Sequence, residues 1–192
     1  MTPPIVRVRA VATGTVAPLE WNGRGVRSGI AKTPVHGHVD VGPLGLHGDE
    51  QGDRRHHGGP DKAVLLYPYE HYTAWAGLLA GHPEPGFGEN LSTTGLLETG
   101  TVIGSVYAIG GTVLQVTQPR RPCYKLAALH GVPDLAVRAQ RTGRTGFYCR
   151  VLEPGRLRAG DRIGIPAAIE EDPQRLDLVL GGDRHELVHA AL

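Results

Sequence analysis

Cys123 lies in the segment of the sequence best suited to chemistry, Arg120–Lys125 (RRPCYK). Basic neighbours favour the thiolate form of a cysteine, and the thiolate is the form that acts as a nucleophile or a metal ligand. Pro119 and Pro122 restrict the backbone on both sides of the thiol. A structural thiol with incidental basic neighbours is the alternative interpretation, and this motif alone does not separate the two.

Cys149 is predicted to face the core instead. In the alternating segment Phe147–Val151, residues 147, 149 and 151 share one face of a strand. A buried cysteine commonly acts as a small apolar residue. We therefore expect two free thiols rather than a disulfide, and the N-terminus lacks a signal-peptide pattern. Both features predict a cytoplasmic protein.

A second group of polar residues occurs in the glycine-rich segment Gly48–Lys62. Glycines allow backbone N–H groups to approach an anion closely, and the basic side chains supply charge for a phosphate. A calcium loop of the EF-hand type is disfavoured because Arg54 and Pro60 stand where Gly and Glu are required. Zinc is disfavoured because His56 and His57 are adjacent. A solvated glycine loop is the plain alternative. The candidate ligand-binding residues of this segment are Asp49, Arg54, His57, Gly58, Gly59 and Lys62.

Five further residues complete the candidate list. Glu89 and Asn90 could hydrogen-bond the amide-like edge of a heterocycle, with an ordinary turn over Phe87–Asn90 as the alternative. Lys32 is a candidate anion contact, although a lone lysine in a loop is usually solvated. Arg120 and Arg121 join Lys62 and Arg54 as candidate phosphate ligands.

Short strands separated by glycine turns dominate the predicted elements. Strands are predicted over residues 5–12, 38–41, 63–67, 102–109, 112–118, 146–152 and 162–166. Short helices are predicted after Pro68, over Lys125–Leu129 and over Pro133–Arg141. Residues 21–34 are interpreted as a loop or an interrupted hairpin, and residues 43–62 as a long loop. This pattern predicts a mainly β domain, a barrel or a sandwich, with a few short helices.

The composition limits the classes of partner. The chain has 192 residues and a net charge of +1, from 20 basic and 19 acidic side chains, so nucleic acid is a poor default partner. No apolar run approaches the roughly 20 residues of a membrane span, so no membrane is expected as a partner. The composition changes after Pro166. We therefore expect one domain over residues 1–166 and a short C-terminal tail over residues 167–192 that is not a separate domain.

The motifs, taken in order, resemble the MOSC family, whose domains are related to the C-terminal part of molybdenum cofactor sulfurase. The resemblance runs through GLHGDE at 45–50, HGGPDKA at 57–63, GFGENL at 86–91, VTQPRRPC at 116–123 and GRTGFY at 143–148. It covers roughly residues 5–166. Each motif is modest by itself, but their order and spacing are specific. KTPV at 32–35 and PLGL at 43–46 resemble the stand-alone bacterial YiiM-like branch.

The resemblance implies a fold, a cofactor and a reaction. The fold would be a MOSC-type β-barrel, similar to the pyruvate-kinase barrel. The cofactor would be the molybdenum cofactor (molybdopterin), with Cys123 as the sulfur ligand of molybdenum or, in sulfurase relatives, as the carrier of a persulfide. Soft thiolate ligands suit this metal, and the Arg, Lys and glycine segments suit the phosphate. For the YiiM-like branch, the resemblance implies an oxidoreductase that reduces N-hydroxylated bases such as hydroxylaminopurine, a detoxification reaction. The electrons would come from an external reductase.

Two alternatives and two departures from the family stay open. The chain could be a sulfur-transfer or cofactor-carrier protein that uses Cys123 without turnover, or a non-enzymatic β-barrel binding module. Tyr124 stands where we expect Trp in this branch. The residues after Pro166 are too few for the C-terminal domain of three small helices that branch members often carry. The oligomeric state is also open, a homodimer included.

Overall fold

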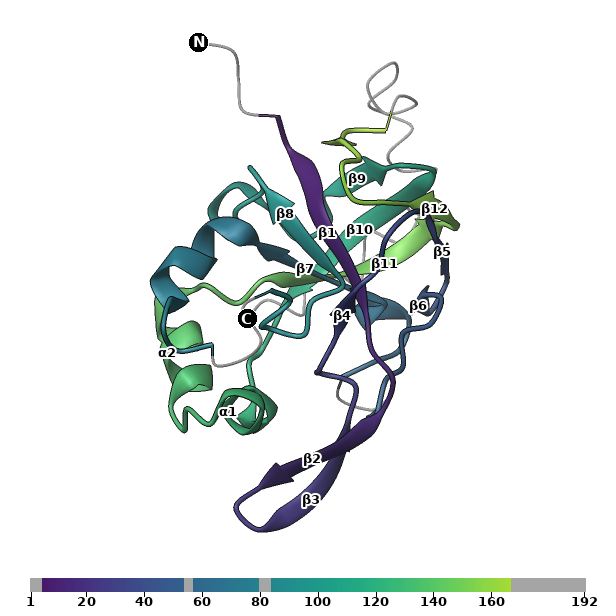
Figure 1. The fold of residues 1–192 in the computed structure, drawn as a ribbon. Coiled ribbons are helices and arrows are strands. Elements are labelled where there is room, and N and C mark those ends of the chain that lie inside the picture. The colour runs from purple at the N-terminus through teal and green to yellow at the C-terminus, as the bar shows by residue number, and fades with distance from the viewer. Residues whose placement is uncertain (1–4, 54–56, 80–83, 167–192) are drawn as a thin grey trace.

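The structure, a computed structural model, describes residues 5–53, 57–79 and 84–166. Within these residues the chain is mainly β, with two short α-helices and three 3-10 helices (Figure 1). The predicted mainly β class with a few short helices is confirmed. The predicted tail, residues 167–192, lies outside the described residues.

Eight strands form the main sheet. Their order is β13-β9-β10-β11-β7-β8-β1-β4, and all pairs are antiparallel except β7 with β8, which is parallel. The strands of this sheet are β1 (Arg7–Thr13), β4 (Thr33–Pro34), β7 (Val64–Pro68), β8 (Leu91–Thr94), β9 (Val106–Ile109), β10 (Thr112–Pro119), β11 (Phe147–Glu153) and β13 (Ile163–Gly164).

The central strand β7 explains why the sheet has a core on both sides. Every residue from Val64 to Pro68 is buried, and a continuous apolar run of this kind is typical of a strand covered on both faces. Leu66 pairs with Phe147 of β11 on one side and with Leu91 of β8 on the other. The main core continues through Val8, Ile109 and Leu114 of the neighbouring strands.

The two ends of the sheet approach each other through a narrow seam between β1 and the segment before β13. Arg7 and Arg162 form one isolated bridge there. Backbone hydrogen bonds run from Val8 N to Asp161 O (2.9 Å), from Ile163 N to Val6 O (2.9 Å) and from Gly160 N to Val8 O (2.8 Å). No continuous ladder joins β13 to β1 in the described residues. The closed barrel that we expected is therefore not confirmed, because a single bridge does not extend a sheet into a closed ring.

A second core attaches the helices to one side of the sheet. The helices are η2 (Tyr69–Trp75), α1 (Tyr124–His130) and α2 (Leu135–Thr142). The rings of Tyr67 and Phe87 stack with centroids 4.3 Å apart, and Trp75 Nε1 donates to the Tyr67 hydroxyl (2.7 Å). Leu126 and Leu135 bring α1 and α2 onto this aromatic group. Both helices end at glycines in the left-handed region, 131 and 143.

A hairpin of β2 (Ala17–Trp21) and β3 (Arg24–Ser28) extends from the body of the molecule (Figure 1). Its turn, Asn22–Gly23, has φ angles of 49° and 71°. Two positive φ angles in a two-residue turn are the type I′ arrangement that matches the twist of paired strands. Of our two interpretations of residues 21–34, the hairpin is therefore the one found, although it begins four residues earlier, at Ala17.

Most predicted elements are found, with several differences. The helix after Pro68 is a 3-10 helix rather than an α-helix. Residues 43–62 contain β6 (Gly45–Leu46) and η1 (Pro60–Lys62), so this segment is not wholly a loop. Three short strands, β4, β8 and β12 (Gly155–Leu157), were not predicted, and β9 begins at Val106 rather than at residue 102. β12, β5 (Val39–Gly42) and β6 form a small separate sheet, and η3 spans Glu98–Gly100.

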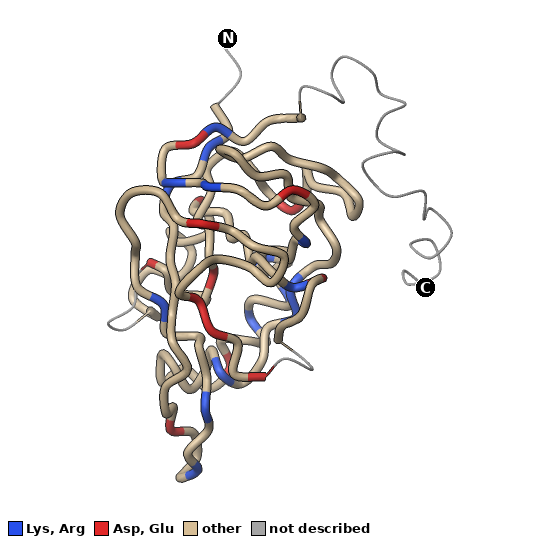
Figure 2. Tube along the Cα trace, turned by 90° about the vertical axis from the view of Figure 1, so that its right-hand side faces the viewer, with Lys and Arg blue, Asp and Glu red and all other residues tan. Residues whose placement is uncertain are grey.

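Acidic and basic residues are distributed along the whole described trace (Figure 2). This distribution agrees with the net charge of +1 in the sequence. A search of the described helices finds none long and apolar enough to cross a membrane.

Candidate functional site

A pocket opens beside Cys123, where six segments of the chain meet. It is bounded by the connection that follows β3, the loop between β6 and η1, the stretch from η1 to β7, the turn before β8, the β10–α1 connection and the first part of β11. The lining residues are Ser28, Gly29, Ile30, Lys32, Asp49, Glu50, Gln51, Gly52, Asp53, His57, Lys62, Leu65, Phe87, Gly88, Asn90, Arg120, Cys123, Lys125 and Tyr148.

The two cysteines occupy different environments, as expected. Cys123 is a half-buried free thiol in the pocket wall, in extended backbone immediately before α1. Cys149 is fully buried in the main core opposite Val116 of β10. Burial raises the pKa of the Cys149 thiol. Of the two thiols, Cys123 is therefore the accessible one.

Cationic side chains surround the thiol. Arg120 is 5% exposed, and its Nη1 atom is buried without a hydrogen-bond partner in the described structure. Lys125, 8% exposed, and Lys62 line the same pocket. A buried guanidinium nitrogen without a partner is costly unless a ligand or water satisfies it. The pocket is therefore suited to an anionic ligand.

His57 and Tyr148 complete the wall around these cations. Burial lowers the pKa of His57, and the nearby charges of Lys125, Arg120 and Lys62 lower it further, while Asp53 opposes the change. The imidazole is therefore neutral at pH 7 and keeps one nitrogen as a hydrogen-bond acceptor. Burial also raises the pKa of Tyr148, with Arg120 acting in the opposite direction.

The inner end of the pocket is a buried polar network centred on Asp49. One carboxylate oxygen pairs with Lys32 Nζ and accepts a hydrogen bond from Gly14 N (2.8 Å). The other accepts one from Asn90 Nδ2 (2.9 Å). Asn90 Oδ1 in turn accepts from Leu65 N (3.0 Å), which fixes the network to β7. Burial lowers the pKa of Lys32, and Asp49 opposes that shift.

Glu89 lies outside the pocket lining and has a structural environment. It is fully buried and accepts hydrogen bonds from Phe87 N (2.9 Å), Ser92 Oγ (3.0 Å) and the Tyr72 hydroxyl. Burial raises the pKa of Glu89, although these hydrogen bonds oppose the shift. Its carboxylate oxygens are therefore occupied by donors from η2, from β8 and from the turn before β8.

The other predicted residues divide between the pocket and its surroundings. Arg121 is exposed and does not line the pocket. Gly58 and Gly59 also lie outside the lining, and Gly59 N donates to Gln51 Oε1 (3.1 Å). Arg54 lies outside the described residues. Lys32, Asp49, His57, Lys62, Asn90, Arg120 and Cys123 are brought together.

Tyr148 and the Gly29–Ile30 segment line the pocket but were not predicted for the site, and Lys125 was predicted only as a basic neighbour of the thiol. A usable signal existed for Lys125, which stands two residues after the thiol. Gly88 gave a weaker signal. Its φ is +71°, and a Cβ atom there would lie 2.7 Å from Ile30 Cγ1. Only glycine allows the two walls of the pocket to approach this closely.

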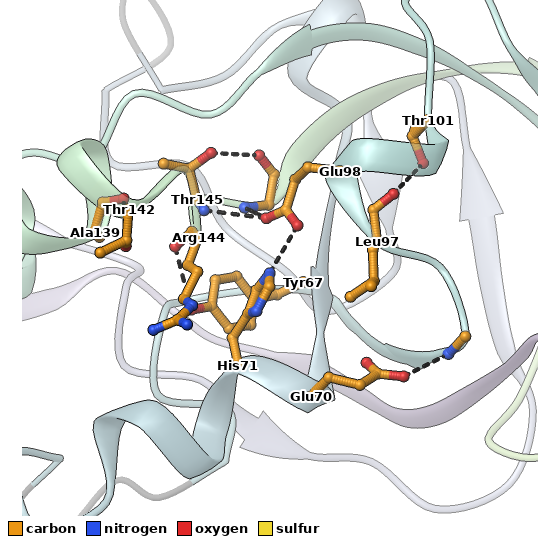
Figure 3. A network of polar contacts seen from close by, with 12 residues as sticks. Tyr67, Glu70, His71, Leu97, Glu98, Thr101, Ala139, Thr142, Arg144 and Thr145 are labelled. Atoms are coloured by element: carbon orange, nitrogen blue, oxygen red, sulfur yellow. Dashed lines mark hydrogen bonds and ion pairs between the residues drawn. The ribbon is translucent and has the colours of Figure 1, made fainter.

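Glu98 holds the loop that precedes β11 (Figure 3). Its carboxylate accepts hydrogen bonds from Thr145 N (3.1 Å) and Gly146 N (2.8 Å), and His71 Nε2 lies 2.7 Å from its second oxygen. Gly146 O accepts from Arg120 N (3.0 Å). The position of Arg120 is therefore linked through one loop to the Glu98–His71 pair.

A search of the described residues finds no group of three or more His, Cys, Asp or Glu side chains that could hold a metal ion.

Comparison with known proteins gives consistent matches. A family model described as MOSC domain matches residues 53–164. The protein YflK of Bacillus subtilis is 44% identical over 157 residues, 81% of this chain and 71% of that protein. Protein YiiM of Escherichia coli is 44% identical over 151 residues, 77% of this chain and 67% of that protein.

A solved structure and a longer relative extend the comparison. The crystal structure of YiiM from Geobacillus stearothermophilus superimposes with a TM-score of 0.65 at 36% identity, covering 82% of this chain and 73% of that one. A protein of Gibberella moniliformis named "Reductase" is 37% identical over 147 residues, which are 73% of this chain and 26% of that protein.

Proposed function

The chain belongs to the MOSC domain family, and from this membership we propose that it binds the molybdenum cofactor and reduces N-hydroxylated bases or related compounds. The family as a whole is associated with this cofactor, and one relative is named a reductase. The pocket beside Cys123 would be the site of binding and reaction.

The observation that carries the proposal is the buried, unpartnered Arg120 Nη1 in the same pocket as the free thiol of Cys123. The cofactor has a soft metal and an anionic phosphate, and the pocket offers a soft ligand and buried cations for these two parts. Lys62 and Lys125 add charge near Arg120. The residues of this chain therefore fit the cofactor.

The roles of the lining residues follow from their environments. Cys123 is the proposed molybdenum ligand, and Arg120, Lys62 and Lys125 the proposed phosphate ligands. The positive charge of Lys32 is already balanced by Asp49, so this pair is better suited to fixing the floor of the pocket. Neutral His57 can accept a hydrogen bond from the bound ligand. When bound, the cofactor would supply two-electron oxygen-atom chemistry.

The proposed reaction balances with an external electron donor. The N–O bond of R–NH–OH breaks, and two electrons and two protons convert the compound to R–NH₂ and water. We propose that a separate reductase supplies the electrons. The cofactor, the substrate class and the donor are all parts of this proposal.

The test is the molybdenum and pterin content of purified protein from a host that makes the cofactor. We expect Cys123→Ser to lose molybdenum and to keep its melting temperature, because an alcohol oxygen is a harder ligand than a thiolate. Cys149→Ala is the control, and it should keep molybdenum at some cost in stability. Equal molybdenum per chain in Cys123→Ser and the parent would refute the assignment.

A sulfur-carrier role is the second candidate, favoured by the partial exposure of the Cys123 thiol. It predicts cyanide-releasable sulfur on Cys123 and no reduction of hydroxylaminopurine by molybdenum-loaded protein supplied with electrons. Turnover without releasable sulfur would favour the oxidoreductase.

A further inference from the structure

Two aromatic side chains from distant parts of the chain meet at the start of α1, outside the lining of the pocket. Trp21 ends β2, and Tyr124 begins α1 directly after Cys123. Their ring centroids lie 6.5 Å apart, with 33° between the ring planes. Tyr124 is 43% exposed and Trp21 is half-buried. A large aromatic surface therefore stands at the surface of the molecule, next to a residue of the pocket.

The packing of the core does not account for these two rings. Neither Trp21 nor Tyr124 belongs to the two apolar cores. Trp75 and Phe87, by comparison, are at most 3% exposed. Leaving a ring in water forgoes the stabilisation that its burial would give. Tyrosine and tryptophan in such positions are typical of ligand-binding surfaces, because they offer a large flat contact with few rotatable bonds.

The hairpin fixes Trp21 relative to the pocket. Trp21 pairs with Arg24 across the Asn22–Gly23 turn, so it lies at the turn end of the two strands. The same hairpin contacts α1, and β3 ends at Ser28, the first of three consecutive residues that line the pocket. One element therefore supplies both the aromatic ring and a wall of the site.

We infer that Trp21 and Tyr124 form an aromatic rim that binds the planar ring of the substrate. The inference rests on the proposed function, since the ring is that of the N-hydroxylated base. A flat heterocycle stacks on aromatic side chains whatever its hydrogen-bonding edge. The pocket itself is lined by charged residues such as Arg120 and Lys125, which suit the cofactor better than an apolar ring.

The experiment measures binding to the cofactor-free full-length chain, with hydroxylaminopurine as the probe and N-methylhydroxylamine as its ringless counterpart. The chain has two tryptophans, and Trp75 is buried, so stacking on the rim should quench the fluorescence of Trp21. We expect Tyr124→Ala to weaken purine binding about five- to a hundredfold, the usual effect of losing one aromatic stack. Tyr124→Phe, which keeps the ring, should bind like the parent.

Equilibrium dialysis gives the affinity where the fluorescent reporter is lost. Trp21→Ala should weaken purine binding as Tyr124→Ala does. Tyr107→Ala is the control: it removes a partly exposed tyrosine from β9 and should leave the affinity unchanged. N-methylhydroxylamine should bind all variants equally. A parent chain that binds no hydroxylaminopurine at millimolar concentrations, or rim variants that bind it as the parent does, would overturn the inference.

The same protein preparations test the aromatic rim and the proposed function separately. Tyr124→Ala should retain molybdenum when produced in a cofactor-competent host, because Cys123 and the cations are unchanged. If the parent holds no molybdenum while purine binding still depends on Tyr124, the proposed reaction fails and the aromatic rim stands.

Discussion

At the scale of single residues, two pairs of neighbours in the chain take opposite environments. Arg120 is buried in the pocket and Arg121 is exposed. Tyr148 lines the pocket, while Cys149 lies in the core. Successive side chains of an extended segment lie on opposite sides, so each adjacent pair is divided. These pairs are natural controls for one another.

The two arginines give the sharpest test of the anion site. Arg120→Ala should weaken cofactor binding about tenfold to a hundredfold, the value of one charge-assisted hydrogen bond of about 1.5–3 kcal/mol. Its melting temperature should fall little, because the substitution also removes a buried nitrogen without a partner. Arg121→Ala should change neither quantity. The measurements are the cofactor affinity and the melting temperature of both variants. An equal loss of cofactor affinity in Arg120→Ala and Arg121→Ala would contradict the prediction.

The two thiols should differ in reactivity in the cofactor-free protein. Alkylating reagents act on the thiolate of an accessible cysteine, and Cys149 is fully buried with its pKa raised by burial. We expect Cys123 to be labelled at least about tenfold faster at neutral pH. Peptide mass analysis over time gives both rates. Similar rates would mean that the core around Cys149 opens as readily as the pocket.

At the scale of elements, η3 matters because it presents Glu98 to the loop before β11 (Figure 3). Burial alone would raise the pKa of Glu98, but the His71 contact and the hydrogen bond from Gly146 N lower it below its ordinary 4.5. A carboxylate with a lowered folded-state pKa stabilises the fold above its ordinary pKa, and this stabilisation is lost as pH falls through the folded value.

The predicted consequence is a pH-dependent cost for Glu98→Gln. At pH 7 the variant should lose about 1–2 kcal/mol of unfolding free energy, because a neutral amide replaces a charged acceptor. The difference from the parent should shrink as pH falls below 4.5, where the parent carboxylate becomes protonated. Denaturant unfolding across pH measures it. Glu153→Gln, at an exposed glutamate of β11, is the control and should cost little at any pH.

The elements found by sequence reasoning are those with a clear periodic signal. The alternating residues of β1 and β11 and the apolar run of β7 predict strands correctly. β8 (LSTT) was missed because its polar side chains are buried by neighbouring strands, which no alternation within the segment reveals. Residue type likewise predicted both Glu89 and Asn90 as site residues. The fold decides between them, because only Asn90 lines the pocket. Tyr148 was missed because it sits in a strand whose other face is core.

At the scale of the whole molecule, the described sheet, both cores and the pocket all lie before residue 167. We therefore expect a chain that ends at Asp172 to fold and to keep its cooperative thermal transition. Circular dichroism melting and gel filtration beside the full chain measure this. Insolubility, or a broad transition, would show that residues 173–192 belong to the core or to an interface between subunits.

The seam between β1 and the segment before β13 sets how the molecule should open under native conditions. β10 and β11 pair over a long ladder, from Val113–Glu153 to Pro119–Phe147, whereas the seam has one bridge and three backbone hydrogen bonds. Amide protons of Val8, Gly160 and Ile163 should therefore exchange with solvent deuterium through small local openings. The amide protons bonded within the β10–β11 ladder should exchange only when the whole fold unfolds. The sheet would then separate first along one line, with the long ladder that leads to Cys123 still intact.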